Sequence, residues 1–250
     1  MVDQLSAEEQ VTEFVGRLEA LLQGVLGNQE ISYLDQVEGH YARGGRTSYT
    51  IRQNGDGIPL FCGGEHALNL SLMFDCSCRK DRSWLQIDKS LLMLSGQDEH
   101  VPIIRFDFLR RVSSQIPSAH INVYGTNDTA TRLMLACSGG VRSKSRRKKY
   151  LDDGAFPTFS SLHIPVGGDR FRPGLEDLLQ MAIYEFHIDV ADSWQAVLTK
   201  SREEYRTNQL KSLIAEFPDV AYQALKEEGL VEGELPTRPG RDGESRLVKY

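Results

Sequence analysis

The sequence lacks any uninterrupted apolar run of about 18 residues, the minimum length for a helix that crosses a membrane. Its first residues include Asp3, Glu8 and Glu9, whereas a secretory signal carries basic residues ahead of an apolar stretch. We therefore expect a cytoplasmic protein that does not bind membranes.

Cysteine is also scarce. The cysteines are Cys62, Cys76, Cys78 and Cys137, and their mostly apolar or strand-like surroundings favour free thiols over a disulfide framework. Cys76-Ser-Cys78 resembles one half of a zinc site, but no second Cys or His pair follows at the spacing of a zinc finger. We expect no metal and no other cofactor.

Two common signatures of enzymes are missing. No serine stands in the Gly-x-Ser-x-Gly context of a hydrolase nucleophile, and no histidines are paired at the helical spacing of a metalloprotease. The net charge of −6 also disfavours general binding to polyanions. Six basic residues nevertheless crowd into positions 142–149, so nucleic-acid contact is expected only there.

The N-terminal segment is predicted to be an amphipathic helix over residues 5–27, because its apolar side chains recur at spacings of three and four. Ser6 and Glu9 have the pattern of a capping box. Gly27 suits the left-handed conformation that ends many helices.

From residue 31 to 137 the apolar period changes to two. The clearest alternation lies at 68–74 and 104–108, and weaker candidates lie at 41–53 and 83–95. Clusters of Gly, Pro, Asn and Asp separate these segments, as expected for tight turns. The predicted fold class is α+β, a mostly antiparallel β-sheet meander covered by an N-terminal helix and C-terminal helices.

Residues 138–160 interrupt this pattern. They show no apolar period and contain the basic run, so we expect a mobile basic loop. The polar, Gly-rich and Pro-rich end of the chain, 231–250, is expected to be a disordered tail. The remaining residues, 1–230, are assigned to a single domain.

A strand and helices are expected over 161–230. One helix opens at Pro173, where the missing N–H of proline costs nothing, and two more cover 192–216 and 218–229. The side chains expected to face the core from the last two helices are Trp194, Leu198, Tyr205, Leu213 and Leu225.

Two strand motifs each place a histidine next to aliphatic residues, His120-Ile121-Asn122-Val123 and His163-Ile164-Pro165-Val166. Alternation puts both imidazoles on the polar face of the sheet. If the strands are neighbours, His120 and His163 could serve as general base and general acid on a phosphodiester. The motifs resemble the repeated signature of the two-histidine phosphoesterases, in which a hydroxyl residue occupies the positions held here by Asn122 and Pro165. The alternative is a pair of half-exposed strand histidines without a catalytic role.

A strand, a glycine turn and a helix start meet at Gly167-Gly168-Asp169-Arg170-Phe171-Arg172-Pro173. Backbone N–H groups at a helix start, together with arginine side chains, suit an anion. The residues expected to bind such a ligand are Gly167, Gly168, Arg170 and Arg172, with Arg105, Asn122 and Tyr124 from the polar sheet face. The alternative is a tight turn whose arginines pair with nearby acids, namely Asp169, Glu176 and Asp177.

The basic run consists of Arg142, Lys144, Arg146, Arg147, Lys148 and Lys149. Such residues bind phosphates in a salt-dependent way without reading the base sequence. No aromatic residue interrupts the run, so it lacks the pattern of a base-stacking platform. We expect weak nucleic-acid contact, and the alternative is a solvated loop without a partner.

One part of the chain resembles a known group of proteins. Residues 162–186 (LHIPVGGDRFRPGLEDLLQMAIYEF) and the helices over 194–229 resemble actinobacterial and mobile-element proteins that have no assigned activity. The resemblance implies a bacterial or phage setting, such as phage defence or a toxin–antitoxin pair, and no mechanism.

Three functions follow from these observations. The leading hypothesis is a binding or regulatory protein that recognises an anionic small molecule or a partner protein. The first alternative is a metal-independent phosphodiesterase or nuclease that uses His120 and His163, with an arginine stabilising charge on the phosphate. The second alternative is a structural or assembly subunit whose long terminal helix is partly an interface. The oligomeric state stays open.

Overall fold

The computed structural model describes residues 5–27, 32–35, 38–42, 46–79, 85–98, 101–110, 116–126, 128–136, 141–161, 164–166 and 172–233. Four expected site residues, His163, Gly167, Gly168 and Arg170, lie outside this part of the chain, as does most of the expected tail. Among the described residues, no helix combines the length and apolar character needed to cross a membrane.

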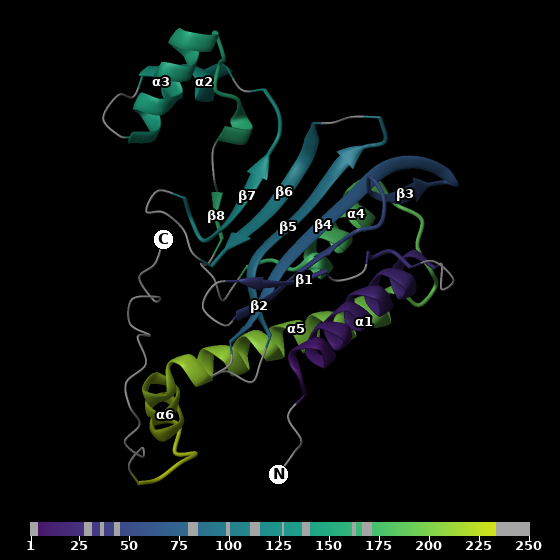
Figure 1. The fold of residues 1–250 in the computed structure, drawn as a ribbon, viewed down its shortest axis with the longest axis vertical. Helices are drawn as coiled ribbons and strands as arrows, with labels where there is room; N and C mark the ends of the chain where they lie inside the picture. The colour runs from purple at the N-terminus through teal and green to yellow at the C-terminus, as the bar shows by residue number, and fades with distance from the viewer. Residues whose placement is uncertain are drawn as a thin grey trace.

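An antiparallel sheet forms the centre of the fold (Figure 1). Its strands run in the order β1-β2-β4-β5-β6-β7-β8, and β3 also pairs with β4. Every pair is antiparallel, so the predicted α+β class is confirmed. The strands are β1 Glu38–Ala42, β2 Arg46–Arg52, β3 Ile58–Cys62, β4 Glu65–Arg79, β5 Gln86–Gly96, β6 Pro102–Leu109, β7 Ala119–Val123 and β8 Ile164–Pro165.

Helices lie on one face of the sheet and beyond one end of it (Figure 1). Within the described residues they are α1 Ala7–Leu26, α2 Asp128–Ala136, α3 Val141–Asp153, the short 3-10 helix η1 Phe159–Ser161, α4 Leu175–Phe186, α5 Trp194–Glu216 and α6 Pro218–Glu227. α1, α4 and the first part of α5 contribute buried side chains to the core on that face. α2 and α3 lie beyond the end of β7, away from this core.

The first helix begins and ends where the sequence predicts. The Ser6 hydroxyl accepts a hydrogen bond from the Glu9 amide at 3.2 Å, and the Glu9 carboxylate accepts one from the Ser6 amide at 2.7 Å. Gly27 has φ 82°, the left-handed conformation that closes the helix. The apolar stripe of α1 is buried against the sheet, as the period predicted.

The core forms where the period-2 face of the sheet meets the apolar stripes of the helices. β4 buries the alternating residues of 68–74, and α4 buries one apolar face. The buried residues that represent these two layers are Leu68, Leu70, Leu72, Phe74, Leu178, Leu179 and Ala182. Because these residues pack on one face of the sheet, the polar side chains of the strands lie on the opposite face.

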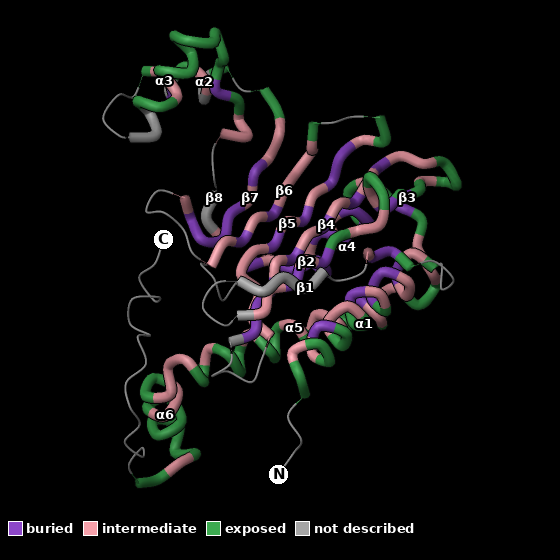
Figure 2. The backbone as a smooth tube through the Cα atoms, in the orientation of Figure 1, coloured by how far each residue is buried: buried purple, intermediate pink, exposed green. Residues whose placement is uncertain are grey.

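The last two helices face the core less than expected. Leu198 is buried, but Trp194 and Tyr205 are only half-buried and Leu225 is 43% exposed. The 23-residue α5 is about 35 Å long, and its second half extends past the sheet together with α6 (Figure 2). The predicted apolar stripe there has no sheet to cover it.

The expected mobile loop over 138–160 is wrong for most of its length, because Val141–Asp153 form α3. A second unexpected helix, α2, lies within the segment predicted to be β-rich. Periodicity missed α3 because the helix has no apolar stripe, although lysine and arginine are good helix formers. The helix ends at Gly154, whose φ is 67° and whose amide donates to the Tyr150 carbonyl at 3.0 Å.

Three cysteines lie in the described chain as free thiols, and their reactivities should differ. Burial, with the nearby charges of Asp88 and Asp75, raises the pKa of Cys76 to about 12. We expect a maleimide at about pH 8 to label Cys76 only after unfolding, because its thiolate fraction is about 10⁻⁴. Cys62 is only half-buried and should react first. A time course followed by peptide mass spectrometry checks this, and equal rates in the folded protein would contradict it.

Candidate functional site

Four polar side chains meet on the sheet face opposite to the core, where β6 pairs with β7. The register places Asp107 opposite His120 and Arg105 opposite Asn122. One carboxylate oxygen of Asp107, Oδ2, accepts from Arg105 Nε at 2.7 Å and from Asn122 Nδ2 at 2.8 Å. The same oxygen lies 3.4 Å from His120 Nε2. These four residues are named the Asp107 cluster.

The cluster holds Asp107 in its ionised form. Burial raises the pKa of this carboxyl, but hydrogen bonds and positive charge from His120 and Arg105 outweigh burial, so the pKa is lowered. The side chain of Asn122 is also buried, and among the described residues its Oδ1 has no hydrogen-bond partner. The cluster therefore joins two strands through one charged centre.

His120 is poorly placed to act as a catalytic base. Its side chain is only 3% exposed, and its Nδ1 lies 3.0 Å from the Pro117 carbonyl oxygen. Each ring nitrogen therefore faces an acceptor oxygen of the protein, and the buried ring is not open to a substrate. The alternation of this strand was predicted correctly, but the expected half-exposed histidine is wrong, because this part of the polar face is covered.

The strands that carry the two histidine motifs are neighbours. β7 and β8 pair antiparallel, with His120 opposite Pro165. His163 lies outside the described residues, so the structure gives no distance between the two imidazoles. Tyr124, another expected ligand residue, follows β7 and is half-buried, and its amide donates to the Ile103 carbonyl at 3.0 Å.

Arg172 is the arginine of the predicted glycine-arginine turn that the structure describes, and it lies on the core face. Its guanidinium carbon lies 3.8 Å from the centroid of the buried Phe108 ring, within the range of a cation–π contact. Arg110 approaches the same ring at 5.9 Å. The Tyr205 hydroxyl donates to the Arg172 carbonyl at 3.1 Å. Burial raises the pKa of Tyr205, although the charge of Arg172 opposes this, so the phenol stays a donor.

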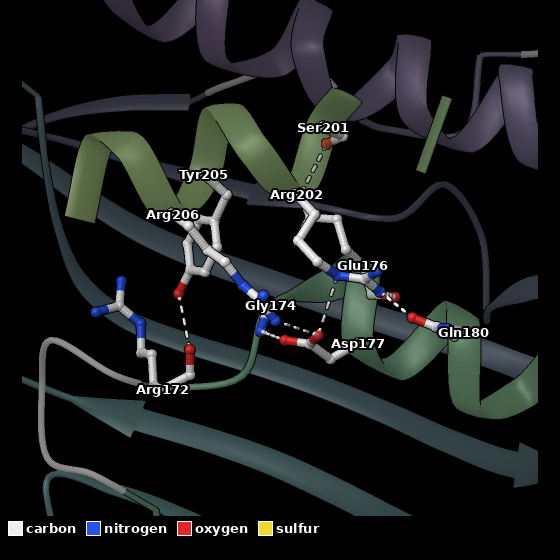
Figure 3. Close-up of polar contacts among 9 residues, drawn as sticks. All are labelled: Arg172, Gly174, Glu176, Asp177, Gln180, Ser201, Arg202, Tyr205 and Arg206. Atoms are coloured by element: carbon white, nitrogen blue, oxygen red, sulfur yellow. Dashed lines mark hydrogen bonds and ion pairs between the residues drawn. The ribbon is translucent and has the colours of Figure 1, made fainter. Parts of the chain in front are cut away.

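A polar network links α4 to α5 (Figure 3). Ser201 Oγ donates to Glu176 Oε1 at 2.6 Å, and Arg202 Nη2 donates to the Glu176 carbonyl at 3.2 Å. Asp177 Oδ1 lies 3.4 Å from Arg202 Nε and 3.6 Å from Arg206 Nη2. Glu176 and Asp177, which were expected as possible partners of the turn arginines, thus contact residues of α5 instead. These contacts fix α5 against the start of α4.

A cleft of about 1480 Å³ lies between α1, α5 and the core face of the sheet. Segment 172–176 closes one side of the cleft, and the α4–α5 network holds that segment in place. Apolar side chains from α1, the sheet and α5 lie at its base, and most of them are core residues with little exposed area; they include Phe14, Leu18, Leu21, Phe74, Leu92 and Val197. Side chains of both charge signs surround them, including Glu13, Arg17, Lys200, Glu204 and Lys211. These residues form the α1–α5 cleft.

Sequence reasoning missed this cleft because its two helical walls are far apart in the chain. Arg172 was the one residue of the predicted binding set that also lines the cleft in the described part of the chain. Each helix carries an apolar stripe that looks like an ordinary core face, and no local pattern distinguishes a filled core from an open groove. The alternation of strand 104–108 places Arg110 on the same face as Phe108. No pattern in the sequence placed Arg172 beside that ring.

The basic run lies in α3, remote from the cleft and from the Asp107 cluster (Figure 1). Lys144, Arg147, Lys148 and Lys149 are exposed and Arg146 is half-buried, while Arg142 lies in the first turn of the helix. In the part of the chain that the structure covers, no three His, Cys, Asp or Glu side chains are grouped as metal ligands.

Three separate features are therefore candidates for the functional site: the Asp107 cluster, the α1–α5 cleft and the α3 surface. Of these, the cleft offers by far the largest space to a ligand. Comparison of the chain with protein-family models, with curated proteins and with solved structures found no match.

Proposed function

We propose that this chain is a binding protein that holds an amphipathic helical segment of a partner protein in the α1–α5 cleft. The observation that carries the proposal is the size of the cleft. Pockets for small molecules usually measure about 300 to 1,000 Å³. A helix about 10 Å wide and about 12 residues long occupies on the order of 1,400 Å³, so a cleft of about 1480 Å³ has room for one.

The lining suits such a segment as well as the volume does. An amphipathic helix that enters a groove buries residues at positions i, i+3, i+4 and i+7 and leaves its polar face at the rim. The α1–α5 cleft has apolar residues inside, such as Leu18 and Leu92, and charged residues such as Lys200 and Glu204 around them. A rim with both charge signs favours a partner whose polar face is also mixed.

The other hypotheses have less support. A phosphodiesterase needs a histidine that a substrate can reach, whereas His120 is buried and each of its ring nitrogens faces an acceptor oxygen of the protein. An anionic small molecule remains the main competitor, because Arg110 and Arg172 both line the cleft. This competitor is included in the test.

The test is selection of a displayed library of random 14-residue peptides on the full chain. Blocking variants on the two facing walls are Gly16→Trp in α1 and Ser212→Trp in α5, both at exposed positions that line the cleft. A Cβ at Gly16 would meet no atom of the described residues within 4 Å, so there is room for the new side chain. Ser145→Trp on the exposed surface of α3 is the matched control.

We expect enriched peptides with a helical apolar stripe, and binding at least tenfold weaker to both blocking variants than to Ser145→Trp. Dodecanoate serves as the small anionic probe in parallel. Peptides that bind all variants equally would contradict the proposal. If dodecanoate binds and no peptide does, and if both blocking variants lose dodecanoate binding, the ligand of the cleft is an anionic amphiphile and not a partner helix.

A further inference from the structure

The cationic helix α3 has a position that suits a second binding surface. It lies beyond the end of β7, and all of its described side chains from Lys144 onward are exposed except that of Arg146 (Figures 1 and 2). Arg146 Nη2 donates to the Ser161 carbonyl at 2.6 Å and ties the helix to the following segment. Lys144, Arg147, Lys148 and Lys149 face solvent.

The charges of α3 favour the helix only near its end, where Lys148 and Asp152 are an opposite pair at i and i+4. Lys144 has like-charged neighbours at i+3 and i+4, Arg147 and Lys148, which is unfavourable on a helix surface. The cations also lie in its N-terminal part, while Asp152 and Asp153 lie at its C-terminal end, the reverse of what the helix dipole favours. A feature that opposes local stability without a gain in packing points to binding.

The helical period aligns these charges. Lys144, Arg147, Lys148 and Leu151 fall on one face at spacings of three, four and seven. Tyr150 follows Arg147 by three positions, and its ring packs against that of Phe156, with centroids 4.7 Å apart. Phe156 is 61% exposed and Tyr150 is 36% exposed. The fold therefore places the aromatic rings of Tyr150 and Phe156 beside the basic run 142–149, which itself contains no aromatic residue.

We propose that this face of α3 binds single-stranded nucleic acid. Lys144, Arg147 and Lys148 contact phosphates, and the exposed Tyr150–Phe156 pair stacks on a base. A duplex keeps its bases stacked and offers no free base face to the aromatic pair. The net charge of −6, despite this basic helix, makes the rest of the chain repel polyanions and confines binding to α3.

Fluorescence anisotropy with labelled dT15 and with its duplex tests the proposal on the full chain. Replacing Lys144, Arg147 and Lys148 by Gln should weaken dT15 binding at least tenfold at 50 mM salt. The same change should reduce the slope of log affinity against log salt by about 2, since each phosphate contact contributes about 0.7. The control variant carries the same charge change elsewhere, at Arg52, Lys89 and Lys226.

The aromatic pair is tested separately. Phe156→Ala should weaken dT15 binding about tenfold and leave duplex binding unchanged, because only the single strand loses a stacked base. Thermal midpoints of all variants check the fold, and the triple Gln variant should be at least as stable as wild type. The proposal fails if wild type does not bind dT15, or if the α3 variants match the control. Binding to phosphatidylserine vesicles without binding to dT15 would assign the face to an anionic membrane instead.

Discussion

Asp107→Asn should lower the free energy of unfolding by about 3 kcal/mol at neutral pH, a fall of about 6 to 12 °C in Tm for a chain of this size. The reason is that Arg105 and Asn122 both donate to one carboxylate oxygen, which also lies 3.4 Å from His120 Nε2. An amide accepts these hydrogen bonds more weakly than a carboxylate does. It also leaves the positive charge of Arg105 without the negative charge of Asp107 beside it, in a largely buried site. Chemical and thermal denaturation measure the loss.

The effect should depend on pH with a defined sign. The pKa of Asp107 is lowered in the folded state, so its contribution to stability is full above the ordinary pKa of an aspartate and is lost as the pH falls below that value. The gap between wild type and Asp107→Asn should therefore narrow between about pH 5 and pH 3. Asp56→Asn, at an exposed turn, is the control and should change stability by less than about 0.5 kcal/mol. A loss that is constant with pH would contradict the role assigned to the charge.

Gly24→Ala should destabilise the fold by about 1 to 2 kcal/mol, although alanine is the better helix former. A Cβ at Gly24 would lie 2.8 Å from Val197 Cγ1 and 2.9 Å from Val197 Cγ2, where α1 crosses α5. The β-branched valine has little freedom to rotate away, so the two helices must separate. Thermal and denaturant unfolding measure the change.

Two companion variants make this result specific. Gly16→Ala in the same helix meets no neighbour within 4 Å and should stabilise by about 0.5 to 1 kcal/mol. Val197→Ala should recover part of the loss when combined with Gly24→Ala, because it removes the clashing methyl groups. If Gly24→Ala were as stabilising as Gly16→Ala, the close approach of α1 and α5 that shapes the cleft would be wrong.

The elements with strong local patterns could be predicted from the sequence, and those without could not. α1 carries both an apolar stripe and the Ser6–Glu9 capping box, so its ends were predicted within two residues. α3 was missed because charged residues fill nearly every turn, and periodicity detects a helix through its buried face. The second half of α5 was predicted to face the core because its apolar residues, such as Leu213, align on one face of the helix. Such an alignment does not show where the sheet ends.

The candidate sites show a similar division. Arg105, His120 and Asn122 were correctly placed on one sheet face, but the residue that joins them, Asp107, was not selected because the partner strands were unknown. Arg172 was selected as an anion ligand, and its stacking on Phe108 depends on a contact between segments about 60 residues apart in the chain. The cleft depends on the relative position of α1 and α5, which no local pattern encodes.

The most direct test of the central claim is methyl NMR of the full chain with and without a peptide selected on it. If the α1–α5 cleft is the binding site, the methyl signals of Leu18, Leu21, Leu92 and Val197 should shift on titration. Those of Ile58 and Leu60, which are buried in β3 and do not line the cleft, should stay in place. Shifts confined to exposed residues such as Leu151 or Leu210, with unchanged cleft signals, would contradict the proposed function.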